Sequence, residues 1–298
     1  MKRLYDSIID RHLADYRQMA FVSGPRQVGK TTTCRGKGRV YFDWDATRHR
    51  RLIVAGPAET ARAAGLDELR ASRPVLVFDE LHKYPKWKNF LKGFFDLYES
   101  QCQVIVTGSS RLDVYRRGGD SLMGRYFPYR MHPLSVAELL DTTLPGDALI
   151  RAPKRLDEAS FKALWRHGGF PEPYLKRQSS FSRRWQRLRH DQLFKEDVRD
   201  LTSIQDVAMA EILGQMLKER SSEQLVITHL ARDLGVAPNS VKAWVHALCA
   251  LHMGFLVRPW HRNISSALRK EPKWFLRDWS SVRDVGQRTE TFVACQLL

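Results

Sequence analysis

The sequence predicts an α/β fold built on a parallel sheet, followed by a mainly helical region. Two short apolar runs, 75–78 and 104–107, are bounded by polar or turn-forming residues, as expected of central strands that are covered on both faces. An amphipathic helical pattern over 85–99 separates them, and such alternation is typical of a three-layer α/β domain. After Leu144 helical periods dominate, which indicates a second region.

The other elements of the first half follow from the same kinds of local pattern. The run 19–22 predicts a strand that leads into a glycine-rich turn. Ser135 begins a helix, because Glu138 stands at capping-box spacing from it. The remaining expected strands are 40–44 and 126–131, and the remaining expected helices are 4–16 and 58–72.

Proline and glycine at Pro145, Gly146 and Pro153 mark the start of the second half. Its first expected helices are 157–167, 180–200 and 207–220, with a rigid turn over 168–173. A pair of helices, 227–235 and 241–253, follows on either side of a tight turn, and two short strands are expected over 254–259 and 274–278. Two helices and a hairpin in this order make a winged helix.

The chain carries a large excess of positive charge. It has 49 Lys and Arg against 33 Asp and Glu, for a net charge of +16. The excess is spread over both halves, and since a fold does not need it, it indicates a polyanionic partner. The 43% hydrophobic content excludes a wholly disordered chain.

The spacing of the cysteines and the hydropathy of the chain indicate the cellular compartment in which the protein is expected. Cys34, Cys102, Cys249 and Cys295 are far apart and lack the spacing of metal ligands, as in proteins of a reducing compartment. The N-terminus lacks the apolar core of a signal peptide, and the longest largely apolar run is too short to span a bilayer. We therefore expect a cytoplasmic protein without a membrane partner.

The strongest motif is GPRQVGKT, which fits the pattern GxxxxGK[ST] between a strand and a helix. Glycines let several backbone N–H groups point at one phosphate, and the helix N-terminus adds its dipole. We expect Lys30 to reach the β- and γ-phosphates and Thr31 to ligate Mg²⁺. The expected cofactor-binding residues here are Gly24, Pro25, Arg26, Gln27, Val28, Gly29, Lys30, Thr31 and Thr32. The alternative is a chance match in a turn.

Two carboxylates follow the apolar strand 75–78. Its carboxyl end is expected beside the phosphate loop, so Asp79 is a candidate Mg²⁺ ligand and Glu80 a candidate for orienting and polarising the attacking water. The alternative is a simple helix start. At the end of the next strand, Thr107 or Ser109 could contact the γ-phosphate or the water, although Ser109 could equally be a helix N-cap.

Phosphoryl transfer also needs positive charge on the developing transition state. Arg125 is our candidate for an arginine finger or sensor, with a neighbouring subunit of a homo-oligomer as one place where it could act. No guanine-reading NKxD motif is present in the sequence, which favours ATP over GTP.

Several of these stretches together resemble a known family. GPRQVGKTT, YFDWD, VLVFDELHKYPKWKNFLKGFFD and VIVTGSSRLDVYRRGGDSLMGRYF, with GGFPEPYL and ITHLARDLGVAPNSVKAWVHALCALHMGFLV later on, resemble prokaryotic AAA-type P-loop ATPases with a C-terminal winged-helix region of unassigned function. The resemblance covers nearly the whole chain. It implies a P-loop NTPase core with nucleotide roles for Lys30, Thr31, Asp79 and Glu80.

Relatives of this kind usually continue into a nuclease-like domain, so we expect the chain to be truncated there, with a natural C-terminal helix as the alternative. The expected domains are 1–143 (AAA-type, ATP-binding), 144–220 (helical linker), 221–282 (winged helix) and 283–298 (start of a truncated domain).

The winged helix is a candidate DNA-binding element. Contacts are expected from the start of its second helix and from phosphate-binding residues of the wing: Asn239, Ser240, Lys242, Arg262, Arg269, Lys270 and Lys273. The alternative is packing against the ATPase core or a partner. We expect a Mg²⁺-dependent ATPase that couples nucleotide state to DNA or a protein partner. The other hypothesis is a DNA-binding regulator in which ATP is a switch without significant turnover.

Overall fold

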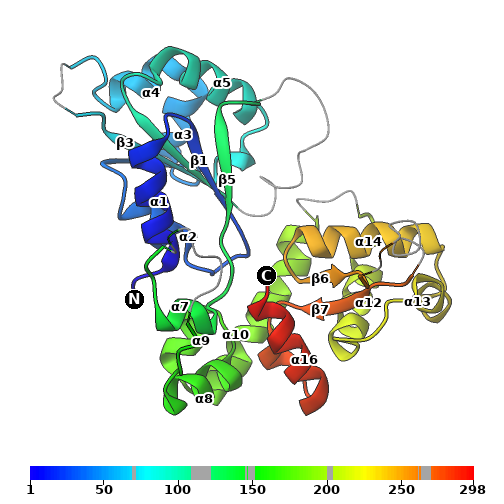
Figure 1. The fold of residues 1–298 in the computed structure, drawn as a ribbon. Coiled ribbons are helices and arrows are strands. Elements are labelled where there is room, and N and C mark those ends of the chain that lie inside the picture. Colours follow the sequence, from blue (N-terminus) through cyan, green and yellow to red (C-terminus); the bar gives the residue numbers. More distant parts are fainter. Residues whose placement is uncertain are drawn as a thin grey trace. The chain divides into compact units, whose positions relative to one another are not determined.

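A computed structural model describes most of the chain, in two compact units (Figure 1). The described residues are 1–68, 72–108, 122–144, 146, 152–199, 204–260, 262 and 270–298. The first unit consists of Met1–His132 and Asp141–Pro153, and the second of Pro133–Leu140 and Lys154–Leu298. The expected division after residue 143 differs from this one, because 133–140 group with the second unit. None of the helices in the described part is long and apolar enough to cross a membrane.

The first unit is a five-stranded parallel sheet with helices. Its strands are β1 (Met19–Ser23), β2 (Val40–Asp43), β3 (Val75–Asp79), β4 (Gln103–Thr107) and β5 (Tyr126–Arg130). Its helices are α1 (Leu4–Asp15), α2 (Lys30–Arg35), α3 (Thr47–Ala55), α4 (Pro57–Ala63), the 3-10 turn η1 (Leu81–Lys83) and α5 (Trp87–Tyr98). The strand order is β2-β3-β4-β1-β5, and every pair is parallel. This confirms the predicted α/β fold with a parallel sheet.

The core of the first unit forms where α5 packs on the sheet. α5 buries Phe90, Leu91 and Phe94 on one face, as the helical pattern predicted. The rings of Phe78 in β3 and Phe94 meet edge to face, with centroids 5.4 Å apart. Burial of each such side chain stabilises the fold by about 1.5–3 kcal/mol. The packing holds the carboxyl end of β3 in place.

The structure differs from the prediction of one helix over 58–72. It has α3 before this stretch and then α4, which ends at Ala63. Gly56 separates them with φ 114°, and Pro57 begins α4, a position where its missing N–H costs no helical hydrogen bond. α3 escaped prediction because arginines occupy much of its surface and hide the apolar spacing.

The second unit is mainly helical. Its elements are α7 (Val136–Leu140), α8 (Glu158–His167), α9 (Pro171–Lys176), α10 (Ser179–Gln192), the π-helical η2 (Leu193–Val198), α12 (Val207–Glu219), α13 (Ile227–Leu234), α14 (Pro238–Ala250), β6 (Gly254–Val257), β7 (Lys273–Leu276), the 3-10 turn η3 (Trp279–Ser281) and α16 (Val285–Gln296). The stretch 168–173 was predicted to be only a turn, and this was wrong, because Pro171 starts the short helix α9. The single helix expected over 180–200 changes from α-helical to π-helical at Leu193.

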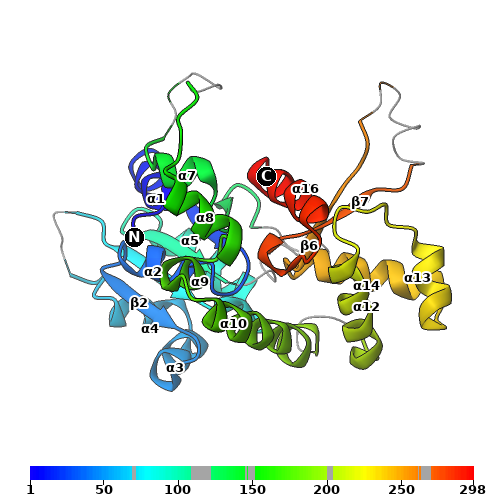
Figure 2. The same cartoon turned by 90° about the horizontal axis from the view of Figure 1, so that it is seen from below.

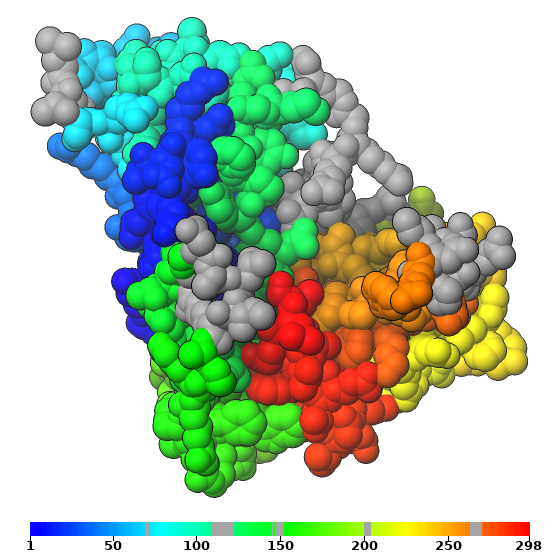
Figure 3. Space-filling model, viewed as in Figure 1, coloured from blue at the N-terminus to red at the C-terminus, as the bar shows by residue number. Residues whose placement is uncertain are grey.

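Two hydrophobic cores are formed by the described residues of the second unit. Helices α12, α13 and α14 share one core with the antiparallel pair β6–β7, and Trp274 of β7 is fully buried in it. Figure 2 shows how the ribbons of these elements are arranged. The other core joins α7, α8, α9, η3 and α16. Trp279 lies within it and donates from Nε1 to the Leu164 carbonyl at 3.0 Å. Phe292 anchors α16 in this core, while the opposite side of α16 lies on the surface of the unit (Figure 3).

Candidate phosphate-binding site

The loop 24–29 leaves the carboxyl end of β1 and enters α2. Gly24 has φ 146°, and a Cβ there would lie 2.4 Å from the Met131 carbonyl oxygen. Gly29 has φ 104°. Neither position can hold a larger residue without strain. The two glycines of the sequence motif therefore allow the tight backbone curve of a phosphate loop.

Lys30 is the first residue of α2, and its side chain is buried. Its ammonium donates to the carbonyl oxygens of Gly24 at 2.9 Å and Pro25 at 2.8 Å. Burial lowers its pKa from 10.5 to about 8, although the nearby carboxylates of Glu80 and Asp79 oppose this change. The ammonium thus lies against the loop with two carboxylates in its electrostatic range.

Asp79 ends β3 and accepts hydrogen bonds from three hydroxyl groups. Thr31 Oγ1 donates to its carboxylate at 3.0 Å, and the hydroxyls of Tyr41 and Thr107 donate to it at short range. Thr107 is in register with Asp79 on the adjacent strand β4. The carboxyl ends of β3 and β4 and the start of α2 therefore meet at this carboxylate. Thr107 is one of the two residues proposed from the sequence.

Glu80 follows β3 in a left-handed conformation, with φ 54°. Lys83 Nζ lies 3.3 Å from its carboxylate and 2.6 Å from that of Asp45. Burial raises the pKa of Glu80, while the charges of Lys83 and Lys30 oppose the rise. The ion pair with Lys83 therefore holds the Glu80 carboxyl group in place, and burial makes that group bind a proton more tightly than an exposed glutamate does. The sequence motif had not identified Lys83.

Two further side chains of the site were also missed. Arg3 is buried, and its guanidinium donates to the carbonyl oxygens of Val28 at 2.6 Å and His132 at 2.8 Å, so it ties the start of α1 to the phosphate loop. Tyr41 reaches Asp79 from β2, and burial followed by the bond to Asp79 raises the pKa of its hydroxyl. No sequence motif marks either residue, because both contacts join distant parts of the chain.

The structure does not bring Arg125 to this site within its own chain. Its carbonyl accepts from Met19 N at 2.9 Å, which places it at the amino end of β1, whereas the phosphate loop is at the carboxyl end. Its side chain pairs with Asp96 at 2.7 Å. Ser109, the other sequence candidate, lies outside the described residues. Of the expected nucleotide-binding residues, Gln27 is exposed in the loop, and Thr31 and Thr32 are exposed at the start of α2.

Comparison with known proteins agrees with this geometry. Residues 16–140 match the family model of an AAA domain. The five strands and the phosphate loop of the first unit lie within this match, so the unit is an AAA-type P-loop domain. Residues 158–288 match a second model, described as a domain of unknown function (DUF8612).

Curated relatives of the chain include two mycobacterial proteins. Over 263 residues the chain is 24% identical to uncharacterised proteins of Mycobacterium bovis and Mycobacterium tuberculosis. The match covers 87% of this chain and 54% of each relative, so the chain spans about half the length of the curated relatives it matches.

Among solved structures, the Aeropyrum pernix Orc1 protein in complex with DNA has a TM-score of 0.39 and 15% identity, covering 99% of this chain and 92% of that one. The family match and the strand order, rather than this weak likeness, support the AAA assignment.

The residues that the sequence suggests for DNA contact differ in exposure and in their partners within the second unit. Asn239 and Lys242 are exposed in the first turns of α14, and Arg262 and Lys270 are exposed between β6 and β7. Lys273 instead pairs with Glu290 of α16 at 2.5 Å. Arg269 lies outside the described residues.

Proposed function

We propose that the first unit binds ATP with Mg²⁺ and hydrolyses it. The observation that carries this proposal is the meeting of Thr31 with Asp79, beside the buried ammonium of Lys30 and the carboxyl group of Glu80. A phosphate loop alone can bind an anion. A carboxylate held against the loop threonine, and a second one with raised proton affinity next to it, are what hydrolysis additionally needs.

The donor set fits Mg²⁺. A threonine hydroxyl and a carboxylate are hard oxygen ligands, which Mg²⁺ prefers, and it completes its shell with waters and phosphate oxygens. Thr31 and Asp79 would hold the ion, Tyr41 and Thr107 would orient the Asp79 carboxylate, and Lys30 would meet the phosphates. When bound, Mg²⁺ would neutralise charge on the transferred phosphoryl group. Glu80 would accept a proton from the attacking water. Arg125 has no part in this proposal within its own chain.

Removal of Mg²⁺ tests the proposal directly. The purified chain should release inorganic phosphate from ATP with Mg²⁺ present, and chelation by EDTA should abolish the release, because the phosphate charge would lack its counter-ion. Release should return when Mg²⁺ is added in excess of the chelator. Turnover that is equally fast in EDTA would contradict the role given to Thr31 and Asp79.

We further propose that the second unit contains a winged helix that binds DNA, so that the ATPase is coupled to DNA engagement. Three features support this. The helices α13 and α14 are joined by a short turn through Gly235 in the left-handed conformation, β6 and β7 form a hairpin after them, and exposed basic residues lie on α14 and between the strands. A homo-oligomer remains a further proposal, with Arg125 acting on a neighbouring subunit.

DNA binding should depend steeply on salt if this is correct. Affinity for duplex DNA should fall linearly in a plot of log affinity against log salt, and the Lys242→Ala change should reduce the slope by about 1, because one phosphate contact is lost. Lys162→Ala on α8, where Lys162 pairs with Glu158 at 2.5 Å, is the matched control and should leave the slope unchanged. A protein whose affinity for duplex DNA does not depend on salt would contradict the proposed DNA partner, because contacts between basic residues and phosphates always weaken as salt rises. ATP turnover measured with and without DNA then separates a coupled ATPase from a regulator without turnover.

A further inference from the structure

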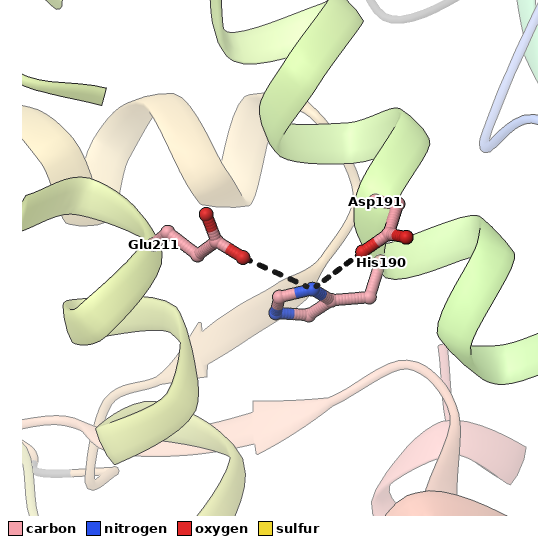
Figure 4. Close-up of side chains that lie close together, drawn as sticks. All are labelled: His190, Asp191 and Glu211. Atoms are coloured by element: carbon pink, nitrogen blue, oxygen red, sulfur yellow. Dashed lines mark ion pairs between the residues drawn. The ribbon is translucent and has the colours of Figure 1, made fainter. Parts of the chain in front are cut away.

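A group of potential metal ligands lies in the second unit, within residues 154–298. His190 and Asp191 are adjacent near the end of α10, and Glu211 faces them from α12. The imidazole Nδ1 lies 3.8 Å from a carboxylate oxygen of Glu211 and 4.0 Å from one of Asp191. Figure 4 shows both carboxylates directed at the same ring nitrogen. One ligand atom from each of the three residues thus lies within 4.8 Å of the others.

These separations are close to those of a tetrahedral zinc site. With bonds of about 2.0–2.2 Å to nitrogen and oxygen, ligand atoms of tetrahedral zinc are about 3.4 Å apart. The separations of 3.8 and 4.0 Å therefore require a contraction that side-chain rotations can supply. The imidazole nitrogen among the ligands favours zinc over Mg²⁺, because Mg²⁺ prefers oxygen ligands.

The second ring nitrogen of His190 already has a partner. The side-chain amide nitrogen of Gln215 lies 2.9 Å from Nε2. The oxygen and nitrogen of such an amide are interchangeable by a half-turn, so Gln215 can accept a hydrogen bond from Nε2–H. With the amide oxygen turned towards Nε2–H, the ring has the tautomer whose Nδ1 lone pair faces the carboxylates, as is usual for histidine ligands of metals. Burial also lowers the pKa of His190, which favours the neutral ring.

We propose that His190, Asp191 and Glu211 bind a zinc-type divalent cation that clamps α10 to α12. Two helices that the π-helical segment η2 separates in sequence would be joined through one ion. Solvent reaches the group, because the Asp191 and Glu211 side chains are 41% and 38% exposed, and water could complete the coordination. Lys195 lies 3.7 Å from the other oxygen of Asp191, and the charge of Lys218 also acts on His190; both weaken the affinity for a cation without occupying the ligand atoms.

Titration of Zn²⁺ into the nucleotide-free, full-length chain tests the proposal. One equivalent should bind, and it should raise the thermal midpoint, because the assembled site binds the ion more tightly than the unfolded chain does. Glu211→Gln keeps the side-chain shape and should weaken Zn²⁺ binding at least about tenfold. Glu219→Gln, at an exposed position of the same helix, is the matched control and should bind as the wild type does.

Two further measurements separate this site from other metal-binding groups. Asp79→Asn disables the proposed Mg²⁺ site of the first unit and should leave Zn²⁺ binding intact. Co²⁺ bound in place of Zn²⁺ should show no thiolate charge-transfer absorption, since none of the ligands is a cysteine. The proposal is overturned if the wild type binds no stoichiometric Zn²⁺, if Glu211→Gln binds it equally well, or if the Co²⁺ complex shows thiolate ligation.

Discussion

Replacement of Glu80 by glutamine is expected to lower ATP turnover by about 10²- to 10⁴-fold, the usual contribution of a general base. Glutamine has nearly the same shape but cannot take a proton at neutral pH. The fold should persist, because glutamine fills the same partly exposed position and Lys83 retains Asp45 at 2.6 Å. Affinity for ATP should change little, since Lys30 and the loop backbone, rather than Glu80, face the phosphates in the proposed site.

Steady-state phosphate release and equilibrium nucleotide binding, measured on the same preparation, check this prediction. Glu99→Gln is a suitable control, because Glu99 pairs with Arg17 at the end of α5, away from the phosphate loop, and its loss should leave turnover unchanged. A Glu80→Gln protein that hydrolyses ATP at the wild-type rate would show that another group activates the water.

The pH profile gives an independent test of the same residue. A general base acts only when unprotonated, so turnover should fall as pH drops through the pKa of Glu80. Burial raises that pKa above the usual value of 4.5. The acidic limb of the wild-type profile should therefore lie above pH 4.5. In Glu80→Gln the residual turnover should lack this limb.

The sheet was predictable from the sequence because its central strands are continuous apolar runs. The amphipathic helix α5 separates residues 75–78 from 104–107 in the chain, and a parallel sheet covered on both faces buries such runs. The helices were less predictable where polar residues or prolines mask the signal. Arginines hide α3, and Pro171, which was interpreted as part of a turn, instead occupies the first turn of α9.

The candidate site was predictable only where its residues are neighbours in sequence. The phosphate loop and the pair Asp79 and Glu80 are local motifs, since each is read within a few residues. Arg3 and Tyr41 reach the site from 25 and 38 residues away, and only the assembled sheet brings them there. Lys83 lies in the helical turn directly after Glu80. Its ion pair with Asp45, which follows β2, forms only because β2 pairs with β3 in the sheet.

Replacement of Lys30 by methionine is expected to weaken ATP binding and, at the same time, to stabilise the fold. Loss of a charge-assisted hydrogen bond to a phosphate costs about 1.5–3 kcal/mol, so affinity should fall by roughly 10- to 150-fold. The fall of the Lys30 pKa from 10.5 to about 8 on folding means that keeping the side chain charged costs the folded state roughly 3 kcal/mol at neutral pH. Methionine has similar length and avoids this cost.

The dependence of stability on pH follows from the same change. Between pH 8 and 10.5 the unfolded chain keeps the Lys30 proton while the folded chain has lost it, so the free energy of unfolding of the wild type gains a contribution that rises with pH in this window. The Lys30→Met protein lacks this contribution. Its advantage in thermal or denaturant stability, measured without nucleotide, should therefore be largest near pH 7 and should shrink towards pH 10.

Lys37→Met is the matched control for the loss of a lysine in the same part of the first unit. Lys37 pairs with Asp10 at 2.6 Å, outside the phosphate loop, and its replacement should leave ATP affinity unchanged. Wild-type affinity in Lys30→Met would show that the ammonium does not meet the phosphates. A lower midpoint than the wild type at neutral pH would show that the bonds from Lys30 to Gly24 and Pro25 outweigh the cost of burying its charge. The expected pair of effects, weaker binding with a more stable fold, would show that this lysine is kept for the nucleotide and at the expense of stability.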